Sequence, residues 1–298
     1  MVNHRTASAL RTSIERDLQT SSVTGAPPLG HLVGLHRLSE PDGGYALALD
    51  PDRAAMVGGA GLLEVAMLAD LALGGVIRNR VGLAVQMPTI SMTIQLTPHR
   101  VSEVASADGE LTAEVGRTAS ARSRLSTAAG EIVGDAVGVF ALPRLPYTGP
   151  GRSMPWDVVG EEITDETKEF DDTVVEDIAA HAEGSPTVAW GTSHVVQRLV
   201  TTGDRREFAP DPVMANRLGH VQGGALFTAA VLAAAGKGGF SADSLATGTI
   251  AFLEPVRQRE MINAEVTVIK SSGRSLFADV RLQQDDRTCC TVSTVFRR

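Results

Sequence analysis

The sequence predicts an α+β protein of two similar units, in which two antiparallel sheets each wrap around a long central helix and a linker fuses the units. The first observation is an internal repeat. Adding 161 to the residue number carries residues 50–75 onto residues 211–236 without a gap, with identity at eight positions. The second is one long apolar helix in each copy, followed by segments of alternating polarity. Helices and strands do not alternate along the chain, so a parallel α/β sheet is not expected.

The first unit, residues 1–145, contains a hairpin, a helix and a run of strands. Residues 5–19 have helical character, and residues 31–50 indicate a hairpin because a Pro-Asp-Gly-Gly cluster separates two alternating apolar runs. Residues 59–77 are apolar on every side, which is typical of a helix that is buried all round. Four segments with period-2 alternation then favour an antiparallel meander, at residues 87–98, 109–119, 120–128 and 131–143.

A Pro- and Gly-rich stretch separates the units and predicts a linker over residues 146–164. The second unit, residues 165–298, repeats the order of the first. It opens with an acidic helical piece at 165–184, and its central helix is predicted over 223–235. Its predicted strands are residues 187–202, 204–211, 245–255, 261–271, 274–284 and 288–297.

Composition disfavours several functional classes. The net charge of −8 argues against duplex nucleic acid as a partner. The chain shows neither the apolar core of a signal peptide nor an apolar run of about 18 residues, so we expect a soluble, cytoplasmic protein without a membrane partner. Cys289 and Cys290 are the only cysteines and are adjacent, which disfavours a disulfide framework and a thiolate metal site. The histidines lack metal-ligand spacing, so we expect no metal and no cofactor.

Residues 216–224, Asn-Arg-Leu-Gly-His-Val-Gln-Gly-Gly, form the most informative stretch of the chain. They place the amides of Gly223 and Gly224 at the N-terminus of the second central helix. Unpaired N–H groups and the helix dipole polarise a carbonyl oxygen at such a position, and glycine allows it to approach the backbone closely. A tight strand-to-helix turn in a core would also use two glycines, so the pair alone does not define a site.

Together with Asn216 and His220, this stretch resembles thioesterases of the phenylacetyl-CoA thioesterase-like branch of the hotdog superfamily. Those proteins carry an Asn and then a His-Gly-Gly at the start of the helix, and Gln222 stands here in place of the His. The resemblance implies a hotdog fold, here a double hotdog, with acyl-CoA as substrate. It places Asn216, Gly223 and Gly224 in the catalytic set and puts Gln222 at the position of the substrate-positioning His. His220, two residues earlier, either takes over substrate binding from that His or is a loop residue without a role.

The resemblance also implies an acid seven residues beyond the second Gly. Asp70 lies seven residues beyond Leu63, which the repeat aligns with Gly224. In related hotdog proteins the two helices pack antiparallel across a joint sheet, so the acid of one unit meets the motif of the other. Asp70 from the first unit is therefore expected to work with Asn216, Gly223 and Gly224 from the second.

The repeat-related position is expected to be inactive, because it supplies neither a base nor an oxyanion hole. Its residues would be Ala55, Leu62, Leu63 and Val231. Glu64 is a rival acid, but it lies about 120° from Asp70 around the helix, so both cannot face one pocket. Thr89 opens the strand after the helix, where such thioesterases place a hydroxyl near the acid, although a β-branched strand residue needs no function.

We therefore expect hydrolysis of an acyl-CoA or acyl-carrier thioester at one composite site, with Asp70 as general base or as nucleophile. Burial among apolar side chains should raise the pKa of Asp70. Two alternatives are a hotdog protein that binds acyl thioesters without turnover, and an enoyl thioester hydratase or dehydratase. Because hotdogs commonly pair and stack, the chain is either self-sufficient or a homo-oligomer, a dimer or trimer of double hotdogs.

Overall fold

The computed structural model describes two central helices and the strands around them. The described residues are 33–38, 45–51, 60–81, 87–143, 199–202, 205–210, 214, 216, 220–257 and 260–298. The helix expected over 5–19, the linker expected over 146–164 and the acidic helical piece expected over 165–184 lie outside this part of the chain.

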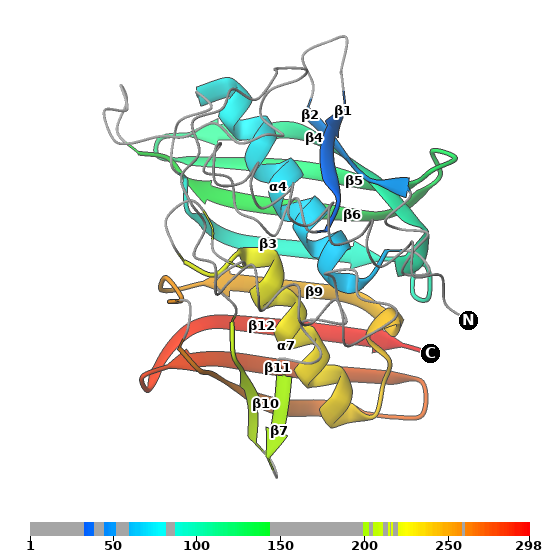
Figure 1. Cartoon of the computed structure of the whole chain (residues 1–298), viewed down its shortest axis with the longest axis vertical. Helices are drawn as coiled ribbons and strands as arrows, with labels where there is room; N and C mark the ends of the chain where they lie inside the picture. The colour runs from blue at the N-terminus through cyan, green and yellow to red at the C-terminus, as the bar shows by residue number, and fades with distance from the viewer. Residues whose placement is uncertain are drawn as a thin grey trace, which may run out of the picture.

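The described strands form one antiparallel sheet of 12 strands (Figure 1). Their order across the sheet is β1-β2-β4-β5-β6-β3-β9-β12-β11-β10-β8-β7. The first six along the chain are β1 (Leu35–Leu38), β2 (Tyr45–Leu49), β3 (Thr89–Leu96), β4 (Val104–Val115), β5 (Thr118–Thr127) and β6 (Ile132–Ala141). The other six are β7 (Leu199–Thr202), β8 (Arg205–Phe208), β9 (Leu245–Phe252), β10 (Ile262–Ser271), β11 (Ser275–Gln284) and β12 (Arg287–Arg297). Two short 3₁₀ helices, η1 (Val101–Glu103) and η4 (Ala242–Ser244), connect them.

The expectation of two separate sheets is corrected by the pairing of β3 with β9, which joins the strands of both repeat copies into one sheet. The register places Thr93 opposite Thr249, and their hydroxyls lie 3.0 Å apart in a hydrogen bond. The strand order read inward from either edge of the sheet is equivalent, so this pair marks a pseudo-twofold centre. The physical reason is that β3 and β9 would each be an unpaired edge strand in a separate sheet, and pairing satisfies their backbone groups.

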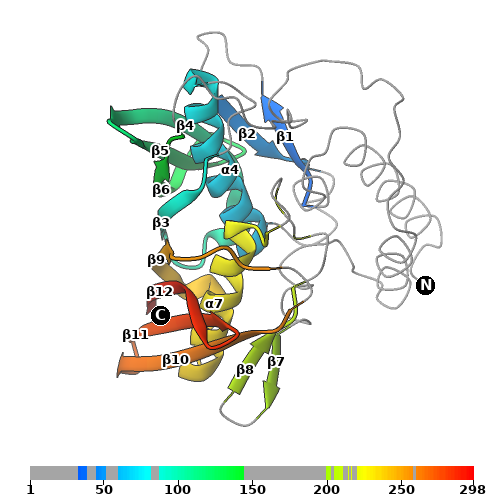
Figure 2. The ribbon, with the colours of Figure 1, turned by 90° about the vertical axis from the view of Figure 1, so that its left-hand side faces the viewer.

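The central helices are α4 (Leu62–Val81) and α7 (Gly223–Gly238). Their first residues differ by 161, the same offset that relates the two copies of the repeat. Every residue of α4 from Leu62 to Gly75 is buried, which confirms the helix that the sequence predicted to be buried all round. The two helices contact one another (Figure 2). None of the described helices combines the length and apolar character needed to cross a membrane.

The outer strand β2 also packs against α4, so the sheet curves around its helix. The contact is made by Tyr45, whose ring is 1% exposed and lies directly over Gly75. The guanidinium of Arg37 lies over the same Tyr45 ring, 4.6 Å from its centre. Only a residue without a Cβ leaves room for the ring at this point of α4.

Gly75→Ala is expected to lower the free energy of unfolding by about 1–3 kcal/mol, because the added methyl would overlap the buried Tyr45 ring. Chemical denaturation measures the effect. The matched control is Gly236→Ala at the equivalent position of α7, where the nearest group is the flexible guanidinium of Arg206, 2.8 Å from the added Cβ. There the substitution is expected to be neutral or to stabilise by up to about 1 kcal/mol, since alanine favours a helix. Equal losses at both positions would contradict this packing.

Candidate active site

Asp70 lies in the middle of α4 and is only 8% exposed. Its carboxylate accepts hydrogen bonds from the backbone N–H of Gly224 and from the side chain of Thr89. The first donor belongs to the first turn of α7, and the second to the start of β3. A carboxylate from one repeat copy therefore meets the N-terminus of a helix from the other copy, where the helix dipole stabilises negative charge.

Burial raises the pKa of Asp70 from its ordinary value of 3.8 to about 6. The cause is desolvation, which disfavours the charged form of a carboxyl group in apolar surroundings. The positive charge of Arg78 and the hydrogen bonds from Gly224 and Thr89 oppose the rise and keep the pKa from going higher. The balance makes Asp70 a carboxyl group that is ionised at neutral pH and titrates close to it.

Arg78 follows Asp70 by eight residues, a little over two helical turns, so its Cβ is rotated by about 80° from that of Asp70 around α4. Its side chain folds back along the helix: Nη2 lies 3.1 Å from the place a Cβ would occupy on Gly74, which is between them in the sequence. Glycine at this position gives the guanidinium room to lie along the helix surface. Arg78 was not predicted from the sequence, and its spacing from Asp70 does not by itself place both side chains on one face of the helix.

The two motif glycines have different surroundings. A Cβ on Gly223 would lie 3.0 Å from Oδ2 of Asp70 and 2.9 Å from Cζ of Phe252, so a side chain there would displace one or the other. A Cβ on Gly224 would lie 2.9 Å from the backbone nitrogen of Met67, so this glycine also lets α7 approach α4 closely. The N–H of Gly224 is used by Asp70, whereas that of Gly223, the first residue of α7, has no acceptor within the helix.

A β-bulge turns Thr89 toward the helices. Thr89 pairs with Phe140 and Ser91 with Val139, so Ile90 is an extra residue on β3. Opposing residues of an antiparallel pair point to the same face of the sheet, and Phe140 is buried, at 2% exposure. The bulge therefore places the Thr89 hydroxyl on the face that carries Asp70. Alternation counted through the rest of β3 would not have predicted this orientation.

The loop before α7 is held by its own hydrogen bonds. Oδ1 of Asn216 accepts a hydrogen bond from the N–H of His220 at 3.1 Å, and the N–H of Asn216 donates to the carbonyl of His220 at 2.6 Å. Asn216 and His220 are thus brought together, and the oxygen of Asn216 serves to close the loop. The catalytic role that the resemblance implies for Asn216 stays a prediction.

Gln222 is the residue directly before α7 and is only 5% exposed. Its carbonyl accepts the N–H groups of Ala225 and Leu226, both at 3.1 Å, and so begins the helix. Its side chain makes no capping hydrogen bond to the helix. The carboxamide is consequently a polar group at the same helix end as Gly223, with donors and an acceptor that the cap does not use.

The position related to this site by the pseudo-twofold is filled by aliphatic side chains. The helix offset of 161 relates Asp70 to Val231 and the two glycines to Leu62 and Leu63, while the strand offset of 156 relates Thr89 to Leu245 and Phe252 to Leu96. These counterparts have small exposed fractions, at Leu62 1%, Leu63 0%, Leu96 6%, Val231 0% and Leu245 0%. Ala55 lies outside the described residues. Polar groups therefore gather at one end of the β3–β9 seam, and apolar groups at the other.

Two further observations bear on the site. Glu64, the rival acid, is also buried on α4, at 6% exposure. Among the described residues, His, Cys, Asp and Glu side chains form no group of three or more that could hold a metal ion. Phe252 and Met67, which border the glycines, were not identified from the sequence, because apolar residues of the core carry no motif that distinguishes them from the rest.

No protein-family model matches the sequence, and no curated protein matches it. The structure is similar to that of a Lactobacillus plantarum protein assigned provisionally as an oleoyl thioesterase, with a TM-score of 0.54, 13% identity, and coverage of 90% of this chain and 98% of that one. The chain has the hotdog fold.

Two mycobacterial structures also match this hotdog chain. The TesB protein of Mycobacterium avium subsp. paratuberculosis has a TM-score of 0.47 and 12% identity, with coverage of 89% of this chain and 92% of that one. The acyl-CoA thioesterase II TesB2 of Mycobacterium marinum has a TM-score of 0.47 and 10% identity, with coverage of 91% and 98%. At this level of identity the similarities concern the fold alone.

Asp70→Asn is expected to raise the free energy of unfolding of the hotdog chain at pH 7 by up to about 3 kcal/mol, since each pKa unit corresponds to about 1.4 kcal/mol. The folded state binds the Asp70 proton more tightly than the unfolded state, with a pKa of about 6 against 3.8. Asp70 therefore costs stability as pH rises through this range. Denaturant titrations at pH 7 and pH 4 measure the difference, which should largely vanish at pH 4. A gain of equal size at both pH values would contradict the buried charge as its cause.

Proposed function

We propose that this chain hydrolyses an acyl thioester, with acyl-CoA or an acyl carrier as substrate, at one composite site between the two units of a double hotdog. The observation that carries the proposal is the buried Asp70 carboxylate, 3.0 Å from the position of a Cβ on Gly223 at the start of a helix from the other repeat copy. An acid beside a backbone donor at the start of a helix is an arrangement that suits acyl transfer.

The thioester carbonyl would lie against the N-terminus of α7. The N–H of Gly223 points out of the helix end and would donate to the carbonyl oxygen as negative charge develops on it. Because Gly224 donates to Asp70, Gly223 is the better placed of the two to act as the oxyanion donor. The carboxamide of Gln222 would supply a further donor to the oxyanion or to water.

Two reaction routes use the same geometry. As a general base, Asp70 takes a proton from water, the resulting hydroxide adds to the carbonyl carbon, and the C–S bond breaks to release the thiol after protonation. As a nucleophile, Asp70 adds to the carbonyl carbon itself, the thiolate leaves, and water then cleaves the acyl anhydride. Single-turnover hydrolysis in ¹⁸O-labelled water tests the nucleophilic route: label in Asp70 requires the anhydride, whereas label in the acid product arises by general-base hydrolysis or by attack of water on the acyl carbonyl of the anhydride.

The surroundings of the site suit an acyl group. The Phe252 ring and the Met67 side chain line the region of the two glycines, and apolar walls with a few placed polar groups are typical of small-molecule sites. The thioesterase assignment of the Lactobacillus plantarum protein is a precedent for this chemistry on this fold.

The remaining parts of the proposal concern organisation. We assign residues 1–145 and 165–298 to the two hotdog units and residues 146–164 to the linker. Because both units share one sheet, a single chain supplies every residue of the composite site. Association into a dimer or trimer of double hotdogs is therefore not needed to form the site. We place the reaction in the cytoplasm, where acyl thioesters are made and used.

Asp70→Asn is expected to lower kcat for acyl-CoA hydrolysis by about 10²- to 10⁴-fold, the usual contribution of a general base, while the fold is preserved. Release of free thiol from short, medium, long and aryl acyl-CoA esters measures the rate. Val231→Ala, at the equivalent position of α7, is the control and should leave kcat per folded molecule nearly unchanged. Equal rates in the wild type and Asp70→Asn would end the assignment. Thermal stabilisation by acyl-CoA without thiol release in the wild type would instead indicate a non-catalytic binding protein.

The acid limb of kcat/KM is expected near pH 6 in the wild type, because Asp70 must be ionised to act as base or nucleophile and its pKa is raised to about 6. Arg78→Gln removes the positive charge that holds this pKa down, so the limb should move to higher pH. A pH–rate profile over pH 4 to 9 for the wild type and for Arg78→Gln measures the acid limb of each. Activity that stays flat down to about pH 4 would show that no desolvated carboxylate limits the reaction.

A further inference from the structure

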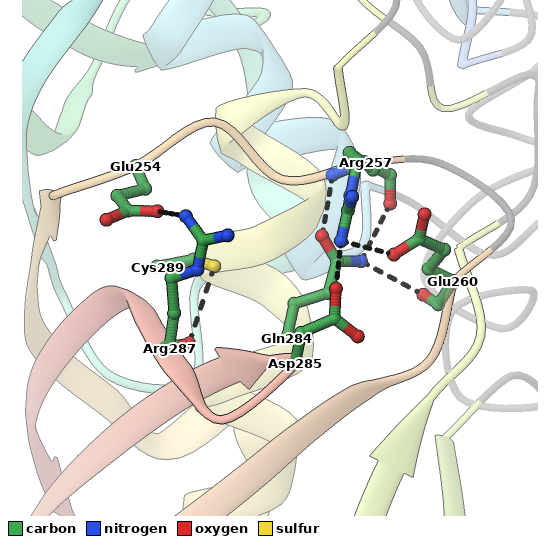
Figure 3. A network of polar contacts seen from close by, with 7 residues as sticks. All are labelled: Glu254, Arg257, Glu260, Gln284, Asp285, Arg287 and Cys289. Atoms are coloured by element: carbon green, nitrogen blue, oxygen red, sulfur yellow. Dashed lines mark hydrogen bonds and ion pairs between the residues drawn. The ribbon is translucent and has the colours of Figure 1, made fainter.

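Gln284 is the last residue of β11 and is only 4% exposed. Its carboxamide accepts a hydrogen bond from the N–H of Arg257 at 2.9 Å and donates to the carbonyl of the same residue at 2.9 Å. It also donates to the carbonyl of Glu260 at 3.3 Å (Figure 3). A single buried side chain thus fixes the backbone at Arg257 and Glu260, two residues of the segment between β9 and β10, in the way that a neighbouring strand would.

This segment in turn holds the chain that enters α7. Arg257 forms an isolated antiparallel bridge with His220, and the N–H of Val221 donates to the carbonyl of Val256 at 2.9 Å. Val221 is two residues before Gly223, the first residue of the helix. A continuous series of backbone hydrogen bonds therefore runs from the Gln284 carboxamide to the helix end that faces Asp70.

The ion pairs around this segment, unlike the contacts of Gln284, lie at the surface. Arg257 pairs with Glu260 at 2.8 Å and with Asp285, and the side chain of Arg257 is 53% exposed. Asp285 and Asp286 form the turn after Gln284, with φ values of 49° and 61°. A further surface ion pair joins Arg287 to Glu254 at 3.3 Å. Exposed ion pairs of this kind contribute little to stability, so the backbone contacts of Gln284 are the ones that fix the segment.

The first repeat copy is built differently at the matching position. Thr127 is the last residue of β5, as Gln284 is of β11. Its hydroxyl accepts a hydrogen bond from the N–H of Glu131, inside its own turn, at 3.2 Å. The copy that contributes the motif glycines is therefore also the copy in which a buried carboxamide ties the neighbouring segment.

We propose that Gln284 is a positioning residue: through Val256 and Arg257, and through residues 220–222, it sets where the N-terminus of α7 stands relative to the Asp70 carboxylate. The proposal rests on the proposed function for its consequence in catalysis. Misplacement of a reacting group by about 1 Å can cost on the order of 100-fold in rate. A change at Gln284 should accordingly act on the chemical step, even though the side chain does not touch the substrate.

Gln284→Met keeps the volume of the side chain and removes its three hydrogen bonds. In the full chain it is expected to lower kcat for acyl-CoA hydrolysis by about 10- to 100-fold, with KM changed by no more than about threefold. Gln284→Glu places a carboxylate oxygen opposite the carbonyl oxygens of Arg257 and Glu260 in place of the donor, so it should lower kcat at least as much and serves if Gln284→Met does not fold. Thr127→Val at the matching position and Arg257→Gln, which keeps the backbone contacts, should both leave kcat nearly unchanged.

Amide hydrogen exchange provides a readout that does not depend on turnover. Exchange in the peptide that contains residues 220–226 should become faster in Gln284→Met, and should stay at the wild-type rate in Arg257→Gln and Thr127→Val. Unchanged exchange and unchanged kcat in a folded Gln284→Met would overturn the positioning role. Absence of thiol release by the wild type would count against the proposed function, while the exchange experiment would still decide whether Gln284 positions the helix end.

Discussion

The arrangement of the candidate site depends on one carboxylate that is buried at the junction of two helices. Asp70 is kept from solvent on α4, which is costly for an ionised group. The cost is reduced by the first turn of α7, by the Thr89 hydroxyl and by the positive charge of Arg78. Since the helix end comes from the other repeat copy, this compensation exists only while the two copies keep a fixed arrangement. The pairing of β3 with β9 provides it, because it makes one sheet of both copies.

Duplication followed by divergence explains the asymmetry of the seam. In two identical copies, each would carry an acid and a helix-terminal glycine pair, and two sites would form. Here the counterparts of Asp70, Thr89 and Gly223 are Val231, Leu245 and Leu62, all buried. Apolar side chains at that end of the seam add to the core, whereas the polar end carries a desolvated charge. The polar end therefore lowers the free energy of unfolding and the apolar end raises it. Such a loss of stability at a functional site is common in proteins.

The neighbourhood of the glycines shows how backbone groups are given separate tasks. Gly224 permits close approach of the helices and donates to Asp70, whereas Gly223 has both the carboxylate and the Phe252 ring close by. Neither position has room for a side chain. The start of α7 is therefore positioned by residues that precede it and pack beside it. These are Asn216 and His220, which are hydrogen-bonded to each other, and Arg257, whose backbone is hydrogen-bonded to Gln284.

The sequence by itself determined the local features. The apolar helix, the helix-terminal glycines and the alignment of Asp70 with its partner motif all follow from residues near one another in the chain or from the repeat. The tertiary structure alone decided that β3 and β9 are the strands that join the two copies in one sheet, that a bulge turns Thr89 inward, and that Phe252 borders Gly223. It also decided which residues face each other across the seam, because strands and helices are related by different offsets, 156 and 161. Hydrophobic periodicity records which face of an element is buried, but not which distant element covers it, and that choice is made only when the sheet closes around both helices.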